Sequence, residues 1–376
     1  MPKGVDTYLK GAVLLYPSAV KTEKRVDFGR YFLALIALVI AVYTVISPKT
    51  AIGEVTVAAV GFARNVLPVM FPFAVATGLL IRSGAGEICG RILEKPFRRA
   101  FGLSGAIAAP FLIGMIAGFP IGAKAVCDTY GRGTCGKGEA ERALALCANP
   151  GFGFTVAGVG YAMWGDLRFG ALLWVSCVLS SVAVGVVGNA IDAVNRKEKG
   201  EDGREARREN SYSEGSAYDG GERSFSLLLT VTETVAESAL TMLRVMAFVV
   251  FFKLISGIIT GFTALLPFFS LGDGGLVSAA ITAFFEFSSG VSEIAAAGLS
   301  SAADGNIWGF GGGTLSRLLT ASALAWSGVS VHMQTAGFTA PSGISMREYY
   351  RGKAASAFLA PLFLMALCAL ATLLGI

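Results

Sequence analysis

Two glutamates lie inside one of the most apolar stretches of the chain. Glu286 and Glu293 flank the residues F-S-S-G-V-S within segment 276–299, which carries no other charge. A carboxylate this deep in an apolar segment is costly unless it is paired, protonated or hydrated. One interpretation therefore makes one glutamate a ligand for a proton or a cation, beside the hydroxyls of Ser288 and Ser289.

The other interpretation is a fixed salt bridge. Lys124, which follows a broken apolar run, and Arg244, which lies inside an apolar segment, are the two candidate partners. The sequence leaves both interpretations open. Lys253 lies near the outer end of its segment, and its ammonium is expected to reach the membrane surface along its flexible stem.

The run G-M-I-A-G-F-P-I-G-A-K (114–124) combines apolar residues with helix breakers. Glycine tolerates conformations closed to other residues, and proline removes a backbone donor. Gly114, Gly118, Pro120 and Gly122 are expected to interrupt a helix near mid-membrane and turn the chain back. Irregular backbone at that depth is tolerated only where it is buried in protein or lines a wet cavity. The stretch therefore predicts a site rather than a lipid contact.

A second interruption is predicted at Asn149–Pro150, because proline frees a carbonyl group and asparagine offers both a donor and an acceptor. The favoured interpretation is a break that lines a polar path, and a simple kink is the alternative. Ser327 marks the corresponding interruption in the second half of the chain. His332, the only histidine, is interpreted as a hydrogen-bonded packing residue beside Gln334 in preference to a proton relay.

Composition identifies the surroundings of these residues. The chain has 376 residues, of which 54% are hydrophobic and only 15% charged, which excludes an ordinary soluble protein. One histidine and six scattered cysteines lack zinc-ligand spacing. The run G-R-G-T-C-G-K-G (131–138) is no phosphate-binding loop, because Gly138 replaces the required Ser or Thr and no strand precedes it. The chain is expected to be an all-α polytopic membrane protein, with no cofactor and no nucleic-acid partner.

The distribution of positive charge predicts how the chain crosses the membrane. The sequence contains nine candidate apolar segments: 31–47, 65–81, 103–123, 143–163, 169–190, 238–257, 276–299, 315–338 and 354–375. If every segment crossed fully, the basic residues of 124–142 and of 191–225 would lie outside the cell, against the positive-inside rule. Two re-entrant hairpins, at 103–123 and 276–299, place most of the 31 Lys and Arg residues inside. The N-terminus is then cytoplasmic and the C-terminus external, in a multi-pass protein of the cell membrane.

The order of these parts repeats in the two halves of the chain. Each half has a span, a broken hairpin, a span with a polar Gly/Pro break and a further span, and each contains three full crossings. Because three is odd, the second copy is expected to insert inverted, and inverted repeats with broken helices at matching places indicate a transporter-type site at mid-membrane. The predicted organisation comprises a cytoplasmic tail, 1–30; a first membrane half, 31–190, with its repeat at about 55–190; a disordered cytoplasmic linker, 191–225; and a second membrane half, 226–376.

These motifs are similar to those of a known family. The stretches F-P-F (71–73), G-F-P-I-G-A-K (118–124) and G-E-A-E-R-A-L-A-L-C-A-N-P-G-F-G-F (138–154) resemble the nucleoside-recognition, or Gate, domain proteins, as do E-F-S-S-G (286–290) and S-G-V-S-V-H-M-Q (327–334). Within that group the chain resembles sporulation integral membrane proteins of the YlbJ type. The resemblance implies a membrane protein of endospore formation, and it leaves open what is moved.

The function expected from these observations is that of a permease-like protein for a small polar solute, nucleoside-like in kind. The alternative is a structural or signalling component of a forespore membrane complex. The sequence contains no nucleophile–base pair of recognisable spacing, so the chain is not expected to be an enzyme. The coupling ion (H⁺ or Na⁺) stays open, as do a homo-oligomer and sporulation-membrane partners. The candidate substrate-binding residues are Gly118, Phe119, Pro120, Gly122, Lys124, Asn149, Pro150, Glu286, Ser288, Ser289, Gly290, Glu293, Ser327, His332 and Gln334.

Overall fold

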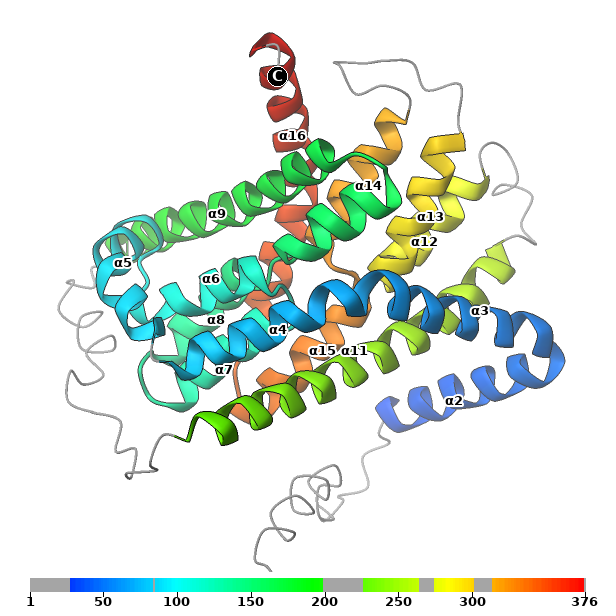
Figure 1. Cartoon of the computed structure of the whole chain (residues 1–376), viewed down its shortest axis with the longest axis horizontal. Coiled ribbons are helices and arrows are strands. Elements are labelled where there is room, and N and C mark those ends of the chain that lie inside the picture. The colour runs from blue at the N-terminus through cyan, green and yellow to red at the C-terminus, as the bar shows by residue number, and fades with distance from the viewer. Residues whose placement is uncertain (1–27, 84, 199–225, 264–273, 301–312, 375–376) are drawn as a thin grey trace, which may run out of the picture. The chain divides into compact units, whose positions relative to one another are not determined.

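The computed structural model describes residues 28–83, 85–198, 226–263, 274–300 and 313–374, and the regular structure of these residues is helical, with no strand. The first part of the chain contains α2 (Phe28–Ile46), α3 (Pro48–Gly61), the π-helix η1 (Phe62–Val66), α4 (Leu67–Arg82), α5 (Ala85–Phe101), the 3-10 helix η2 (Gly105–Ile107), α6 (Ala108–Ile116), α7 (Ile121–Gly131), α8 (Lys137–Cys147), the π-helix η3 (Phe154–Met163) and α9 (Leu167–Glu198). The second part contains α11 (Leu227–Thr263), α12 (Gly274–Phe285), α13 (Phe287–Ser300), α14 (Thr314–Trp326), α15 (Gly328–Ser342) and α16 (Arg347–Leu374) (Figure 1).

The chain divides into two units, Met1–Pro48 and Lys49–Ile376. In the described part, five helices are long and apolar enough to cross a membrane: Gly29–Ile46, Pro48–Leu80, Leu167–Val194, Leu227–Thr263 and Arg347–Leu374. A sixth span arises if the bent pair Gly90–Phe101 and Gly105–Ile116, which meet at 105°, is counted as one. Several helices of this length and composition identify a multi-pass membrane protein.

Four of the predicted apolar segments are broken helices. Segment 103–123 divides into α6 and α7, segment 143–163 into the end of α8 and η3, segment 276–299 into α12 and α13, and segment 315–338 into α14 and α15. The arms α6 and α7 pack on each other, and so do α12 and α13. Both predicted hairpins are therefore helical hairpins, whereas their re-entry into a membrane stays a prediction.

The predicted linker, 191–225, is shorter on its N-terminal side, and the helix that follows it begins earlier than the predicted span. Helix α9 continues to Glu198, and α11 begins at Leu227, well before the predicted start of its span at residue 238. Leucine, alanine and glutamate favour helix, and contacts with α4 hold the added turns of α11. Residues 199–225, where disorder was predicted, lie outside the described residues.

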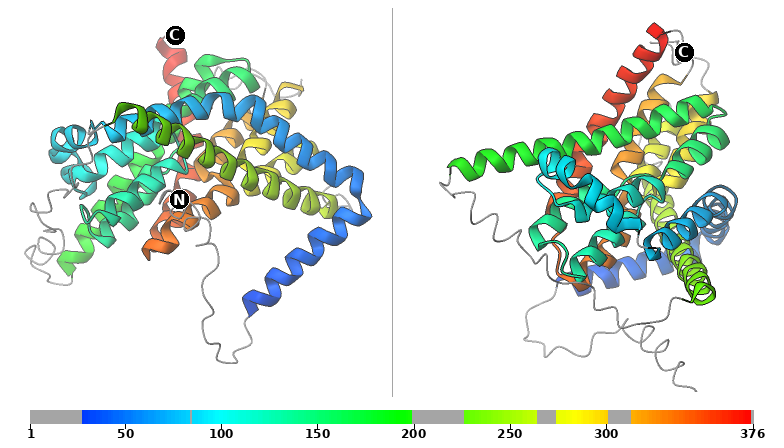
Figure 2. Two further views of the ribbon diagram at one scale, coloured as in Figure 1. Left: turned by 60° about the horizontal axis from the view of Figure 1, so that its bottom comes forward. Right: turned by 60° about the vertical axis from the view of Figure 1, so that its left-hand side comes forward.

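Helix α11 runs antiparallel to α3 and α4. Arg82 at the end of α4 contacts Glu233 and Glu237 near the start of α11, each at 2.8 Å. At the other end, a Cβ on Gly257 of α11 would lie 3.0 Å from the Glu54 side chain of α3. Helix α11 packs mainly on α4, and Figures 1 and 2 show these two helices close together. Helices α4 and α11, one from each half of the chain, thus lie together in opposite directions.

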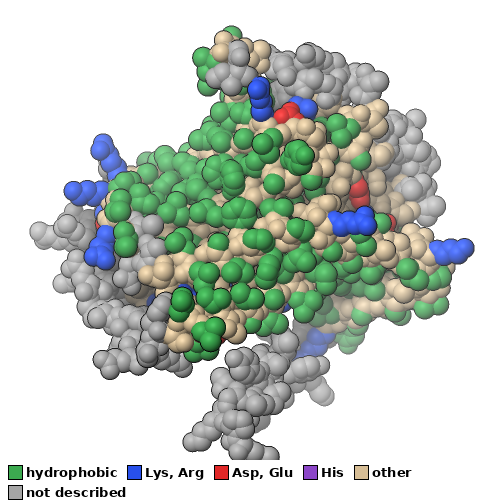
Figure 3. Space-filling view, in the orientation of Figure 1, with side chains coloured by type: hydrophobic (Ala, Val, Ile, Leu, Met, Phe, Trp, Pro, Cys, Tyr) green, Lys and Arg blue, Asp and Glu red, His purple; other side chains and the backbone are tan. Residues whose placement is uncertain are grey.

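Apolar side chains dominate the outward surface of the long helices. Leu80 of α4, Val187 of α9 and Leu240 of α11 are all more than half exposed. On the face drawn in Figure 3, hydrophobic side chains cover most of the surface and most Lys and Arg side chains lie toward its edges. Such a surface fits lipid, which provides apolar contacts but no hydrogen bonds.

We expect the loop between α7 and α8 to face the cytoplasm. Thr134 in this loop and Arg168 at the start of α9 are both exposed. In a chain without native cysteines, a membrane-impermeant maleimide applied to intact cells should label Arg168→Cys, and should label Thr134→Cys only after lysis. Native Cys135 is unsuitable as the probe, because burial raises the pKa of its thiol to about 12.

The matched control for this experiment is Ser345→Cys, at an exposed position between α15 and α16, which should label like Thr134→Cys. Labelling of Thr134→Cys in intact cells would eliminate the first re-entrant hairpin.

Candidate functional site

The tip of the first hairpin is tied to the break after α8. Gly118 has a φ of +82°, and a Cβ at this position would lie 2.5 Å from the backbone nitrogen of Gly151. Only glycine fits this close approach. The Phe119 amide donates a hydrogen bond of 2.8 Å to the carbonyl oxygen of Asn149, whose own side-chain amide donates to Leu146. The interrupted backbone at the hairpin tip thereby donates a hydrogen bond to the interrupted backbone at the break after α8.

The tip of the second hairpin is held by Glu286, which is 0% exposed. Its carboxylate accepts hydrogen bonds from the Ser288 amide (3.0 Å), the Ser288 hydroxyl (2.7 Å) and the Ser289 amide (2.7 Å). These amides belong to the first turn of α13, where backbone donors have no helical partner and negative charge is favoured. Glu286 is therefore the cap of α13, a role that neither sequence interpretation included.

The break after α14 packs against this second tip. Ser327 and Gly328 both have positive φ, at +79° and +74°. A Cβ on Gly328 would lie 3.0 Å from the backbone nitrogen of Phe287. The Trp326 indole donates a hydrogen bond of 3.2 Å to the carbonyl oxygen of Phe284 at the end of α12. Each half of the chain thus packs a helix break against its own hairpin tip.

The two tips meet through aromatic rings. Phe119 and Phe287 contact edge to face, with centroids 5.0 Å apart, and Phe154 of η3 contacts Phe287 at 5.5 Å. The ammonium of Lys353 lies 5.5 Å from the centroid of Phe119. We call Phe119, Asn149, Phe154, Phe287 and Lys353 the tip junction. The tips of the two helical hairpins are thus in contact.

Lys353 is the residue that the sequence interpretation missed. It lies between the predicted apolar segments 315–338 and 354–375, but α16 begins at Arg347 and Lys353 is only 2% exposed. The cause is a close approach of α16 to α8, where a Cβ on Gly352 would lie 2.5 Å from Cβ of Ala145. The Lys353 ammonium donates to the carbonyl oxygen of Ala148. The sequence signal that could have indicated this burial was a lysine next to small residues within a helix.

Glu293 lies in a different cluster from Glu286. Its carboxylate is 2.6 Å from the ammonium of Lys253, which also contacts Glu54 at 2.9 Å. The expectation that Lys253 reaches the membrane surface is wrong, because the residue is 6% exposed and lies between two carboxylates. This cluster joins α3, α11 and α13.

Lys124 lies away from the tip junction and pairs with Asp128 one turn along α7, at 2.6 Å. It lines a cavity of about 500 Å³ between α7 and the end of α15. The ion pairs of the described residues do not join Lys124 or Arg244 to Glu286 or Glu293. Both salt-bridge partners considered from the sequence are therefore wrong for this structure.

His332 and Gln334 are buried on α15. The Nδ1 atom of His332 is 2.9 Å from the Tyr349 hydroxyl, and the imidazole packs edge to face on Trp326. The Gln334 amide donates to Ser330 at 3.2 Å. The Nε2 atom of His332 and the Oε1 atom of Gln334 are buried without a partner among the described residues. The packing role predicted for His332 matches these contacts, with one polar atom left over on each side chain.

The remaining candidate glycines close the hairpins. A Cβ on Gly122 would lie 2.7 Å from Cα of Gly114 on the opposite arm, and a Cβ on Gly290 would lie 2.2 Å from Cα of Ala283. Pro120, in a cis peptide bond with Phe119, is the residue just before α7, and Pro150 is buried in the break. These residues shape the tips through the backbone.

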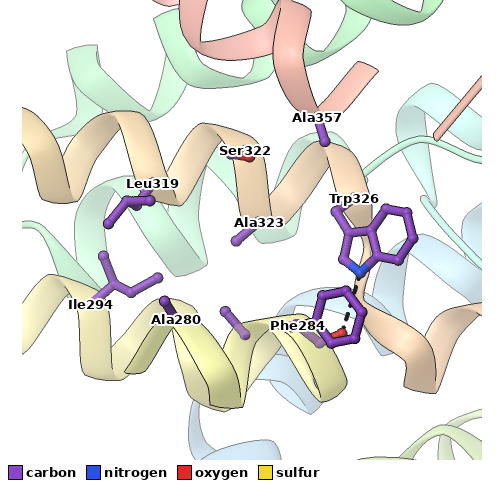
Figure 4. A pocket seen from close by; sticks show the side chains of 9 residues that line it. Ala280, Phe284, Ile294, Leu319, Ser322, Ala323, Trp326 and Ala357 are labelled. Carbon is purple, nitrogen blue, oxygen red and sulfur yellow. Dashed lines mark hydrogen bonds between the residues drawn. The ribbon is translucent and has the colours of Figure 1, made fainter. Parts of the chain in front are cut away.

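A second cavity, of about 220 Å³, lies between α12, α13, α14 and α16. Its lining is almost entirely apolar (Figure 4), and Trp326 stacks on Phe284 at one end with ring centroids 5.4 Å apart. Asn149 and Glu286 line neither cavity. In the described part of the chain, no three His, Cys, Asp or Glu side chains are grouped so that they could hold a metal ion.

Comparison with known families gives one match. Residues 63–247, from η1 to just past the midpoint of α11, match the family model Gate, which is described as nucleoside recognition. This stretch includes the first hairpin and the break at Asn149. The family is of membrane-transporter type and is not an enzyme family. Searches of curated proteins and of solved structures gave no match.

We expect Glu286→Gln to destabilise the protein. Glutamine offers one acceptor oxygen in place of two and turns its NH₂ group toward a backbone donor, so a cost of about 1–3 kcal/mol is expected. Thermal unfolding of the detergent-purified chain measures this as a lower Tm. The matched control is Glu237→Gln, an exposed partner of Arg82, which should change stability by less than about 1 kcal/mol. An unchanged Tm for Glu286→Gln would contradict the capping role.

Lys253→Met should be more destabilising than Glu293→Gln. The lysine variant leaves two carboxylates facing each other, at a cost of about 3–5 kcal/mol for a fully buried site and less here, since the Glu293 side chain is 35% exposed. Glu293→Gln leaves Lys253 paired with Glu54. Thermal unfolding of both variants and of the double variant tests this, and the double variant should recover part of the loss. Equal destabilisation by the two single variants would contradict the arrangement.

Proposed function

We propose that this protein is a transporter that moves a small polar solute, nucleoside-like in kind, across a cell membrane during endospore formation. The observation that carries the proposal is the contact between Phe119 and Phe287. It brings together the tips of two helical hairpins, each already packed on a broken helix. Broken helices that meet in the interior form the solute sites of many transporters. The Gate match over 63–247 supports the nucleoside-like class.

Inverted repeats are part of this proposal. The antiparallel packing of α4 and α11 supports them, because these spans occupy equivalent places in the two halves. The breaks after α8 and after α14 also occupy equivalent places, and each packs on its own hairpin. We propose that the two hairpins enter from opposite sides of the membrane, with a cytoplasmic N-terminus and an external C-terminus.

The tip junction has the chemistry for such a solute. The rings of Phe119, Phe154 and Phe287 offer apolar faces on which a planar base packs. The ammonium of Lys353 and the backbone groups at Asn149 offer polar contacts that would fix its orientation. We propose these residues as the solute site, with Ser327 supporting it from the second break. Lys124 and Glu293 have other partners and are left out.

A non-transporting component of a forespore membrane complex is the second candidate. Asn149 is 1% exposed and Lys353 is 2% exposed, so the tip junction is closed. A permanently closed junction would favour this scaffold role. A transporter also closes its site between inward and outward access, so the closed arrangement agrees with transport as well.

The two candidates differ in what happens when the tips are locked together. Phe119→Cys and Phe287→Cys, in a chain without native cysteines, are to be reconstituted in liposomes and tested with radiolabelled uridine and adenosine. Because both rings belong to the proposed site, we expect uptake under reducing conditions to be lower than that of wild type but above that of empty liposomes, to fall to the level of empty liposomes on oxidation, and to recover with reductant. Each single-cysteine variant is the control and should be insensitive to oxidation.

If liposomes that contain the wild-type chain take up no more uridine and adenosine than empty liposomes do, the nucleoside-like class is contradicted. Uptake that persists in the cross-linked protein would contradict the site. The sporulation role is tested separately, since loss of the chain in its source organism should lower the yield of heat-resistant spores and leave vegetative growth unchanged.

A further inference from the structure

The carbonyl oxygen of Ala148 lies at the negative end of a helix. Helix α8 ends at Cys147, and Ala148 follows it with a non-helical ψ of +78°. The last carbonyl groups of a helix have no partner within it and carry the negative end of its dipole. Because Ala148 is 0% exposed, its carbonyl group needs a partner from the protein or a cation.

That partner is the ammonium of Lys353, and it comes from the other half of the chain. Among the described residues, no carboxylate lies within ion-pair distance of this ammonium, and the Ala148 carbonyl oxygen is its hydrogen-bond acceptor. The Phe119 ring adds a cation–π contact. Lys253, the other buried lysine, differs because it lies between two carboxylates. Lys353 is thus a buried cation held by a helix end and an aromatic ring.

In transporters with broken helices, unwound carbonyl groups and the C-terminal ends of half-helices are where a coupling cation binds. We propose that the Lys353 ammonium occupies this cation place at the end of α8, so that the chain carries its own cation and binds no Na⁺ there. The inference rests on the proposed transporter function and adds that transport is independent of Na⁺. A lysine on α16 is covalently tethered, so it cannot cross the membrane as a coupled ion does.

The test measures ion binding without any solute. The full chain is purified in detergent, and its Tm is compared in NaCl, KCl and choline chloride at equal ionic strength. Wild type should give the same Tm in all three salts. Lys353→Ala should have a lower Tm in choline chloride and should gain about 2–5 °C in NaCl, because Na⁺ can enter the vacated place at the Ala148 carbonyl.

Two variants serve as controls. Lys353→Met fills the same volume without a charge and should show no gain in NaCl. Lys124→Ala removes an exposed lysine that pairs with Asp128 and should respond to the three salts like wild type. A wild-type Tm that is higher in NaCl than in the other salts would overturn the proposal, as would a folded Lys353→Ala chain that is indifferent to Na⁺.

If Lys353→Ala does not fold, equilibrium binding of radioactive sodium ions to the wild-type chain decides the matter. Absence of binding supports the proposal, and saturable binding overturns it. These readouts are separate from nucleoside uptake. A chain that takes up no nucleoside but gains Na⁺ binding in Lys353→Ala would retain the ion-site inference and lose the transport function. A wild-type chain that takes up nucleoside and also binds Na⁺ would retain the transport function and lose the ion-site inference.

Discussion

The hydrogen bond from the Phe119 amide to the Asn149 carbonyl oxygen exemplifies the constraint on which this fold depends. A helix interrupted inside a membrane frees backbone groups, and lipid offers them no partner. Here the freed groups at the hairpin tips are satisfied by neighbours within the same half of the chain, whereas the Ala148 carbonyl is satisfied by Lys353 from the other half. The first hairpin tip bonds to the break after α8, and Glu286 bonds to the amides that open α13. Each break therefore has to lie against a hairpin tip, which fixes the arrangement of each half.

Small residues make these contacts sterically feasible. Gly118 lies against Gly151 in the first half, and Gly328 lies against the backbone of Phe287 in the second. At both glycines a side chain would meet backbone atoms, which cannot move aside as the end of a flexible side chain can. Both also have positive φ, a conformation that disfavours other residues. Once the backbones approach this closely, the adjacent Phe119 and Phe287 rings are left to fill the space between the halves.

The sequence was sufficient for the breaks but not for the pairing of charges. Pro120 and the pair Asn149–Pro150 are local signals, because proline and glycine act on the backbone wherever they stand, and the helices do end there. The burial of Lys353 depends on how closely α16 approaches α8; the neighbouring Gly352 permits that approach, but it does not specify which helix packs there. Likewise, the sequence shows Lys253 only as a residue near the end of a span. Its partners Glu54 and Glu293 are both distant in sequence, so the pairing is visible only in the structure.

The two lysines that are buried among the described residues are bound with different strength. Lys253 is bound by two carboxylates, so separating α13 from α3 and α11 would expose charges in a poorly solvated place. Lys353 is bound by one carbonyl oxygen and one ring face, which are weaker partners for a cation. Considering these lysine contacts alone, moving α16 relative to α8 therefore costs less electrostatic free energy than moving the second hairpin relative to α11. If the tip junction opens, we expect the hydrogen bond between the Lys353 ammonium, from the second half of the chain, and the Ala148 carbonyl oxygen, from the first half, to break before the ion pairs of Lys253.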